Sequence, residues 1–388
     1  MDFGLGEGSE RLRAETRAFL DEVLTDEILE ECHRSGVNHH PRFSKAVSER
    51  GWLALGWPVE EGGQGRSPLE VLAHAEELQR RNAPTYGIGT TMMVSHVIAL
   101  LGTEELKQRI IPRALAAEIV IALGFTEPEN GSDAAAAATR AVRDGDGWTI
   151  TGSKMFTTNA HIADYVFLLA RTDPDVPKHR GLTTFLVPMD QPGVEIQEVR
   201  TLSGERTNIT FYNDVRVGDD LRIGEVDGGW KVMGAALSRE HANGFVGEQQ
   251  RLLADLVAWA REAVGEDGRP RIGDPAVAER IGRSRADIEV SLLLQRRSVW
   301  LQSEGLDVRG KGSMAKLFST ERLERQAAAV LELVGADALR SRGEPSAVRG
   351  GGFEYAVRHA KGTTIYAGTS EIQRDIIAQH ALSLPRPL

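Results

Sequence analysis

The sequence has a single cysteine and no excess of positive charge. Cys32 is the only cysteine among 388 residues, so neither an intrachain disulfide nor a zinc site made of cysteines alone can form. A lone cysteine is typical of a protein from a reducing compartment, and we expect a cytoplasmic location. The formal net charge of −10 argues against a general nucleic-acid binder, because such proteins present a basic surface.

Long apolar runs are also lacking. No stretch approaches the roughly 20 apolar residues of a membrane span, and residues 1–4 lack the basic start and apolar run of a signal peptide. The neighbouring His39 and His40 are not spaced like a metal pair on a helix, so we predict no metal site. What is present is ordinary for a globular protein: 41% of the residues are hydrophobic and 26% are charged.

The period of the apolar residues changes twice along the chain. Residues 1–122 show helical spacing, residues 123–226 follow the period of two of β-strands, and residues 227–388 return to helical spacing. We therefore predict an α+β protein of three domains with these bounds: an N-terminal helical domain, a middle antiparallel β-domain and a C-terminal four-helix bundle. Asp146-Gly147 predicts a tight hairpin turn, and Pro112 predicts a kink or a helix boundary.

Three segments carry residues with chemical potential. The first, Gly124–Asp133, reads GFTEPENGSD and can present backbone N–H groups and the Thr126 hydroxyl to a planar, electron-rich ring. A capped turn would explain Gly131-Ser132-Asp133 but not all ten residues. The second, Gly152–Ala160, reads GSKMFTTNA and includes Phe156, whose apolar face can cover a flat ring. An ordinary core position is the alternative for that aromatic residue.

The third segment, Ile365–Arg374, reads IYAGTSEIQR and predicts a glycine turn that leads into a helix. Gly368 permits a close approach of a ligand to the backbone, and Thr369 is a natural N-cap. The dipole of such a helix stabilises an anionic phosphate at its N-terminus. The alternative is a helix start with no ligand.

Together with the order of helices, β-domain and helical bundle, these segments resemble the acyl-CoA dehydrogenase family from about residue 50 to the end of the chain. The resemblance implies an enzyme that holds FAD without a Rossmann domain. Its reaction would convert an acyl thioester, carried by CoA or by an acyl carrier protein, to the trans-2-enoyl thioester. An electron-transfer flavoprotein is the implied electron acceptor, and a homodimer or homotetramer is the implied assembly.

The resemblance also assigns roles to seven residues: Phe125, Thr126, Ser132, Phe156, Thr158, Thr369 and Glu371. The first three would line the pyrimidine edge of the flavin and the thioester cleft. The next two would lie against the flavin ring and near its N5 atom. The last two would contact the phosphate and ribose portions of FAD.

The catalytic base is missing from its commonest position, because Ala367 stands where many family members carry a glutamate. The reaction removes the α-proton while a hydride leaves the β-carbon for flavin N5, so a base is required. One branch, which includes isovaleryl-CoA and long-chain dehydrogenases, takes its base from the helix that opens the C-terminal bundle. The matching residue is Glu240, four positions after Ala236 and seven after Met233 on one helix face. A structural ion pair is the alternative role for Glu240.

Three departures from the family pattern leave open the orientation of the base and other functions. The glycine pair that usually follows a glutamine later in the bundle is reduced to Leu333-Val334-Gly335-Ala336. His241 replaces the usual arginine beside the expected base, and residues 268–275 read GRPRIGDP where an Arg-x-x-Phe-Gly segment usually contacts the FAD of a partner subunit. Arg269 or Arg271 either replaces that contact or is a solvated loop charge. The alternative functions are a flavin-dependent oxidase or monooxygenase on the same fold, and a non-catalytic subunit of a heteromeric dehydrogenase.

Overall fold

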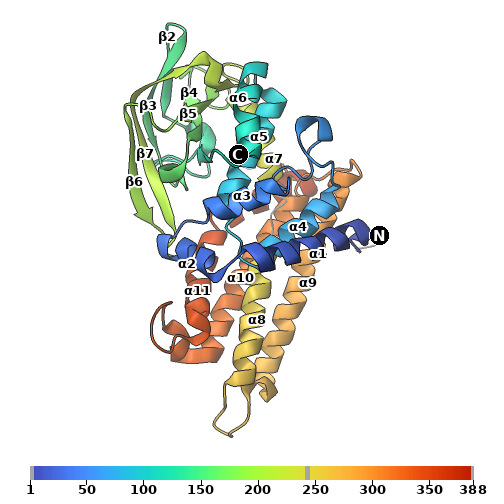
Figure 1. Cartoon of the computed structure of the whole chain (residues 1–388). Coiled ribbons are helices and arrows are strands. Elements are labelled where there is room, and N and C mark those ends of the chain that lie inside the picture. The colour runs from blue at the N-terminus through green and yellow to red at the C-terminus, as the bar shows by residue number, and fades with distance from the viewer. Residues whose placement is uncertain (1–3, 241–244, 386–388) are drawn as a thin grey trace. The chain divides into compact units, whose positions relative to one another are not determined.

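The computed structural model describes residues 4–240 and 245–385. These residues divide into two compact units. The helical unit takes the described parts of Met1–Glu22, Ser67–Ala83 and His241–Leu388. The sheet unit comprises Val23–Arg66 and Pro84–Glu240. The order of helices, then sheet, then helices agrees with the expected fold class (Figure 1).

The helical unit contains seven α-helices among the described residues: α1 (Gly6–Val23), α4 (Pro68–Arg80), α8 (Val246–Glu262), α9 (Pro275–Ser303), α10 (Lys311–Val334), α11 (Gly352–Thr363) and α12 (Ser370–Ile376). Helices α8 to α11 form the C-terminal bundle around a core that includes Leu256, Leu323 and Phe353. The earlier helix α4 also packs on α8 and α9. The bundle therefore recruits a helix from the N-terminal third of the sequence.

Local signals explain where these helices begin. Helix α4 starts after Ser67, whose hydroxyl accepts a hydrogen bond from Glu70 N while the Glu70 carboxylate accepts one from Ser67 N. Helix α9 starts after Asp274, whose carboxylate caps Ala276 N at 2.9 Å, with Pro275 at the first helical position.

The sheet unit contains five α-helices and eight strands among the described residues. The helices are α2 (Asp26–Ser35), α3 (Pro41–Glu49), α5 (Tyr86–Leu101), α6 (Glu104–Leu115) and α7 (Gly229–Glu240). The strands are β1 (Ile121–Gly124), β2 (Arg140–Asp144), β3 (Gly147–Lys154), β4 (Tyr165–Arg171), β5 (Leu182–Pro188), β6 (Val194–Arg200), β7 (Arg206–Gly218) and β8 (Arg222–Ile223).

The strands form one sheet in the order β6-β7-β3-β2-β4-β5-β8, and β1 pairs with β4. Most neighbours are antiparallel, as expected, but β4 lies parallel to both β1 and β2. Strands β4 and β5 are almost entirely buried and apolar, with α5 packed on β1 and α7 on β5. The exposed edge strand β6 carries charged side chains, which disfavour pairing with another chain.

Two local expectations differ from the structure. The β2–β3 turn consists of Gly145 and Asp146, because Gly147 already pairs with Asp144 in the ladder. Gly145 has a φ of +62°, which only glycine adopts without strain. Pro112 lies inside α6, so the boundary is excluded and the alternative, a kink, stays a prediction. The helix tolerates one missing N–H donor because its buried residues Ile110 and Ala114 hold it on both sides of the proline.

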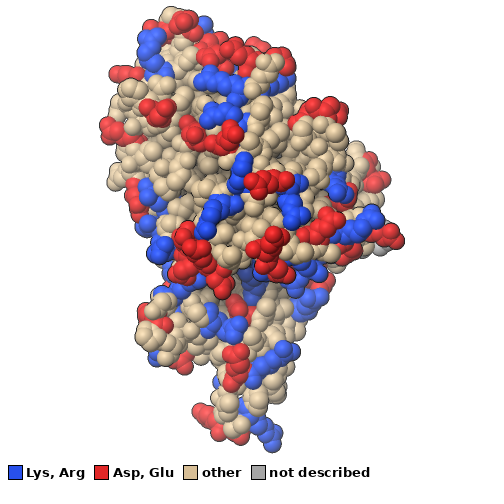
Figure 2. Space-filling view, viewed as in Figure 1, with Lys and Arg blue, Asp and Glu red and all other residues tan. Residues whose placement is uncertain are grey.

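The surface carries charges of both signs. On the face drawn in Figure 2, acidic and basic side chains are interspersed. Across residues 4–240 and 245–385, none of the helices is long and apolar enough to cross a bilayer.

Candidate active site

The loop that follows β1 is anchored by a buried ion pair. Lys154 Nζ lies 2.7 Å from Glu127 Oε1, and the two side chains are 0% and 5% exposed. The Glu127 carboxylate also accepts hydrogen bonds from Ala138 N at 2.7 Å and from Thr139 N at 2.9 Å. Lys154 donates a second bond to the carbonyl of Phe125 at 3.3 Å. The loop is thus held from beneath by the end of β3.

The ion pair shifts the pKa of both groups. Burial alone would raise the pKa of the Glu127 carboxyl, but the charge and hydrogen bond of Lys154 and the two backbone donors outweigh it and hold the pKa at about 2. Burial lowers the pKa of the Lys154 ammonium to about 8 against the opposing effect of Glu127. Near neutral pH the pair is charged, and the Glu127 carboxylate has no role as a proton acceptor.

The second segment, Gly152–Ala160, forms a strained turn that exposes the ring of Phe156 to solvent. Phe156 has a φ of +58°, a left-handed conformation that is unfavourable for a bulky residue, and it is 53% exposed. Its carbonyl accepts a hydrogen bond from Thr158 N at 2.9 Å. Strained backbone and an exposed aromatic ring together mark a ligand-binding position.

Strand β7 holds this turn in place. Thr157 N donates to the carbonyl of Asn208 at 2.9 Å, and the Asn208 side-chain amide donates back to the carbonyl of Thr157 at 3.0 Å. The two bonds grip Thr157 from both sides. The neighbouring Thr158 hydroxyl lies 3.1 Å from the hydroxyl of Thr207.

The two matched segments of the sheet unit lie side by side. Met155 N donates to the carbonyl of Thr126 at 2.8 Å, which joins the loop to the strained turn. Phe125 is half-buried and packs edge-to-face on Phe167, with ring centroids 5.5 Å apart. An outward aromatic ring flanked by half-exposed hydroxyl groups fits one face and one edge of a flavin. Ser132, by contrast, is exposed in the following turn.

In the helical unit the third segment forms the expected turn and helix start. Ala367 and Gly368 have φ values of +55° and +80°, and a Cβ on Gly368 would lie only 2.7 Å from the amide nitrogen of Gln373. The Gln373 amide donates to the carbonyl of Ala367 at 2.8 Å, and Lys316 Nζ donates to that of Gly368 at 2.7 Å. Thr369 caps Ile372 N at 3.3 Å. The two turn carbonyls thus have partners within the unit.

Glu371 lies over the start of its own helix. The pKa of its carboxyl is below the usual value because the carboxylate accepts hydrogen bonds from its own backbone N–H and from the Thr369 hydroxyl. A polar cleft of about 530 Å³ opens beside this helix start. Its lining residues are Glu321, Glu324, Arg325, Thr364, Ile365, Thr369, Ser370, Glu371 and Arg374. Both residues assigned to the phosphate and ribose portions therefore face one cleft.

The expected base belongs to helix α7 (Gly229–Glu240). Met233 and Ala236 are 2% and 0% exposed, so one face of α7 is buried within the sheet unit. Glu240 is the last residue of α7, at the position that follows this face. The side chain of Glu240 and the whole of His241 lie outside the described residues.

The segment that departs from the family pattern is tied to its own chain. Arg271 stacks over Trp259, with 5.6 Å from its guanidinium carbon to the ring centroid, and lies 3.4 Å from the carboxylate of Asp274. These contacts favour a structural role for Arg271.

Sequence reasoning missed the residues that support the turns. Thr207 and Asn208 lie about fifty positions after the turn that they hold, and Lys316 lies 52 positions before Gly368. None of them belongs to a matched segment. The nearest sequence signal is the β-rich run Ile209–Tyr212, which begins directly after the first two. The FAD contacts of the seven assigned residues stay a prediction.

Comparison with known proteins places the whole chain in one group. The N-terminal, middle and C-terminal domain models of the acyl-CoA dehydrogenase family match residues 6–118, 122–214 and 227–382. "Acyl-CoA dehydrogenase FadE26" of Mycobacterium tuberculosis is 35% identical to the chain over 390 residues, which cover 97% of each protein.

Two solved structures cover 100% of this chain and are themselves covered completely, each with a TM-score of 0.91. One is the "Tcur3481-Tcur3483 steroid ACAD", at 34% identity. The other is the ChsE4-ChsE5 complex from Mycobacterium tuberculosis, at 32% identity.

Proposed function

This chain belongs to the acyl-CoA dehydrogenase family, and we propose that Glu240 is the general base of its reaction. The chain is an FAD-dependent enzyme that dehydrogenates an acyl-CoA. The relatives that support this match it over most or all of its length. What remains to be assigned is the carboxylate that takes the α-proton, together with the substrate and the assembly.

The base assignment is carried by two observations: position 367 holds no carboxylate, and the one buried carboxylate of the matched loop is already paired. Ala367 has no group that accepts a proton, and Glu127 is committed to Lys154 and two backbone donors. Glu240 follows the buried face of α7 in helical register with Met233 and Ala236. The reaction needs a carboxylate base near the substrate, and the helix register makes Glu240 the candidate.

In the proposed reaction each residue has one task. Phe156 covers one face of the flavin ring and Thr158 meets the ring edge, while Thr369 and Glu371 meet the phosphate and ribose portions. FAD, when bound, accepts the hydride from the β-carbon of the acyl chain. Glu240 accepts the α-proton on its carboxylate, so that the substrate loses one proton and one hydride and gains a carbon–carbon double bond.

The test is the Glu240→Gln variant, mixed anaerobically with an acyl-CoA that bleaches the flavin of the unaltered protein. We expect bleaching to slow by at least about a thousandfold, since an amide cannot take the proton. Adding Ala367→Glu to this variant should restore part of the rate, because it returns a carboxylate to the position commonest in the family. Bleaching at the original rate in Glu240→Gln would refute the assignment.

We further propose that the chain assembles with an unlike chain of the same family and acts on a bulky, steroid-type acyl thioester. The support is that two fully overlapping structures carry the names of two proteins each, and that one is called a steroid enzyme. The GRPRIGDP segment adds support, because Arg271 is engaged within its own chain where the family usually presents an intersubunit FAD contact. We propose an electron-transfer flavoprotein as acceptor and, from the single cysteine, a cytoplasmic location.

The assembly is tested by native mass spectrometry of the tagged protein isolated from its own cells. A second chain of different mass in equal amount is the expected result, and a complex of identical chains with a full complement of FAD would refute it. A panel of short, branched, aromatic and steroid-type acyl-CoAs then tests the substrate. The steroid-type compound should bleach the flavin fastest.

A further inference from the structure

The hydroxyl of Thr158 is hydrogen-bonded to the hydroxyl of a buried residue, Thr207. Thr207, on β7, is 3% exposed, and its Oγ1 lies 3.1 Å from that of Thr158. In the described part of the chain no other group is recorded as a hydrogen-bond partner of the Thr207 hydroxyl. Thr158 itself is only half-buried, on the turn that presents the Phe156 ring.

The burial of Thr207 decides the direction of this hydrogen bond. A threonine hydroxyl has one proton to donate and two lone pairs to accept with. If Thr158 donated to Thr207, the Thr207 proton would be buried without an acceptor, which is unfavourable. Thr207 therefore donates to Thr158, and the proton of Thr158 is left for an acceptor on the exposed side of the turn.

We propose that Thr207 is a positioning residue that fixes Thr158 as a hydrogen-bond donor to flavin N5. The inference rests on the flavin placement under the proposed function. N5 of oxidised flavin carries a lone pair and is an acceptor, so its polarity matches the free proton of Thr158. The bond from Thr207 also holds the Thr158 side chain in one rotamer, as supporting hydrogen bonds do in other binding sites. No proton leaves either oxygen.

The experiment uses 5-deaza-FAD, in which a C–H group replaces N5 and cannot accept a hydrogen bond. The full-length protein in its native assembly is stripped of FAD, and the dissociation constants of FAD and 5-deaza-FAD are measured by fluorescence. In the unaltered protein FAD should bind about tenfold more tightly, the effect of one hydrogen bond. In Thr207→Val the preference should fall to about twofold or less, and Thr207→Ser should restore it.

Three variants separate the possible causes. Thr158→Val should abolish the preference, since it removes the donor. Thr210→Val is the matched control: Thr210 lies three residues along the same strand, is fully buried, and its hydroxyl lies 3.4 Å from that of Thr157 in the same turn. It should keep the tenfold preference. Thr207→Ala provides a second deletion of the hydroxyl if the valine variant does not fold.

The outcomes are distinct. If Thr158→Val loses the preference but Thr207→Val and Thr207→Ala keep it, Thr158 meets N5 and the role of Thr207 is refuted. Equal loss in Thr210→Val and Thr207→Val refutes it as well, because the effect then belongs to the turn as a whole. No preference in the unaltered protein refutes the placement of Thr158 itself, and the inference with it. Binding is measured without substrate, so these results are independent of the Glu240 assignment.

Discussion

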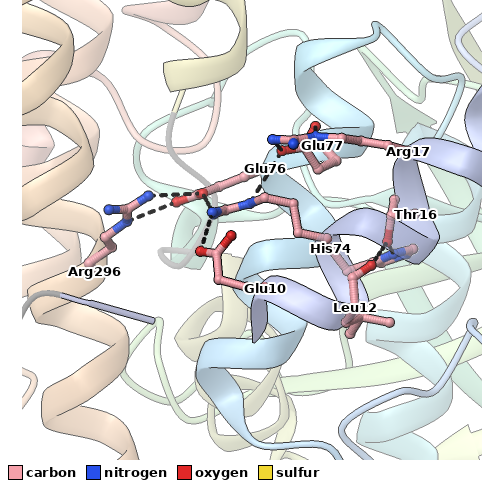
Figure 3. Close-up of polar contacts among 9 residues, drawn as sticks. Glu10, Leu12, Thr16, Arg17, His74, Glu76, Glu77 and Arg296 are labelled. Atoms are coloured by element: carbon pink, nitrogen blue, oxygen red, sulfur yellow. Dashed lines mark hydrogen bonds and ion pairs between the residues drawn. The ribbon is translucent and has the colours of Figure 1, made fainter. Parts of the chain in front are cut away.

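Both units bury charged side chains, but they pair them differently. In the sheet unit, Lys154 and Glu127 form a single enclosed pair with no second charged partner for the ammonium among the described residues. In the helical unit, two carboxylates on α4 are shared among three arginines, two from α1 and one from α9 (Figure 3). The lysine of the sheet unit has a single carboxylate partner, whereas each carboxylate of the helical unit has two arginine partners.

The shared network joins α1, α4 and α9. Arg13 lies 2.6 Å from Glu76 and 3.3 Å from Glu77, Arg17 binds Glu77 with two nitrogens at 2.8 and 2.9 Å, and Arg296 approaches Glu76 at 3.2 Å (Figure 3). The side chains of Glu76 and Glu77 are 10% and 5% exposed, whereas that of Arg17 is 50% exposed. Loss of one arginine still leaves each carboxylate with another.

The two arrangements differ in how much stability depends on a single charged side chain. A buried pair that loses one member leaves an uncompensated charge in a medium of low dielectric constant, which is strongly destabilising. A network with several partners and access to water loses little with each member. The site-bearing sheet unit therefore depends on one lysine more than the helical unit depends on any one arginine.

The largest expected effect is that of Lys154→Met. It leaves the Glu127 carboxylate buried without its cation, and we expect the sheet unit to lose about 3–5 kcal/mol of stability. Urea denaturation with amide hydrogen exchange on β3 measures the loss. Lys178→Met is the control, because Lys178 pairs with Asp133 at 2.6 Å with both side chains about half exposed. Lys178→Met should lower the stability by less than about 1 kcal/mol. Equal losses of stability in Lys154→Met and Lys178→Met would contradict the special role of the buried pair.

The acid sensitivity of the sheet unit should follow Glu127. Its pKa is lowered from 4.5 to about 2 in the folded protein, so the unfolded chain binds the proton first. The stabilisation is present above pH 4.5 and is lost as the pH falls toward 2, by about 3 kcal/mol in all. In Glu127→Gln this pH dependence of the urea midpoint should vanish. Exposed Glu129→Gln should retain it, and an unchanged slope in Glu127→Gln would refute the explanation.

In the helical unit, His74 should make stability fall as the pH is lowered from 6.5 to 4. The Thr16 hydroxyl donates to the carbonyl of Leu12 at 2.7 Å, so at 2.9 Å it can only accept from Nδ1–H of His74 (Figure 3). Burial lowers the pKa of His74 from 6.5 to about 4. Stability is therefore lost between pH 6.5 and 4, by roughly 2–3 kcal/mol.

The same urea series at pH 6.5, 5.5 and 4.5, with amide exchange read on α1 and α4, measures this loss. His74→Gln removes the titrating group and should flatten the slope in this range. Were the slope to persist in the variant, a group other than His74 would be responsible.

The smallest effects are expected in the shared network, for Arg296→Met and Arg17→Met. In Arg296→Met, Glu76 keeps Arg13 at 2.6 Å, so we expect a loss of only about 1 kcal/mol. Arg17→Met should cost still less, about 0.5 kcal/mol, because its side chain is half exposed. Thermal unfolding of the two variants beside Lys154→Met ranks the three. If Arg296→Met lowered the stability as much as Lys154→Met, the remaining arginine would not compensate for the one removed.

The fold was largely predictable because its signals are local. The change of period, the Ser67 capping box and the Asp274 cap each depend on a few neighbouring residues. Local errors arose where tertiary contacts outweighed a local signal. Pro112 stays inside α6 because that helix is packed on both sides of it, and the hairpin turn shifted by one residue because Gly147 is needed in the ladder.

The support of the candidate site was not predictable in the same way. Thr207 and Asn208 reach the Phe156 turn only because β7 pairs with β3, with a register shift between Ile150 and Gly152. Such a shift moves side chains between the faces of a sheet, and nothing in a single strand encodes its partner's register.

The family, the order of helices and strands, and the lack of a glutamate at position 367 can all be read from contiguous residues, because motifs and periodicity are local properties. The side chains that support those motifs come from distant parts of the sequence and are brought there by folding. Lys154 pairs with Glu127, 27 positions away in the sequence. Thr158 and Thr207, which are hydrogen-bonded, are 49 positions apart, and Lys316 and Gly368 are 52 positions apart. Hydrogen bonds and buried charges depend on distances of a few ångströms, which only the packed chain sets.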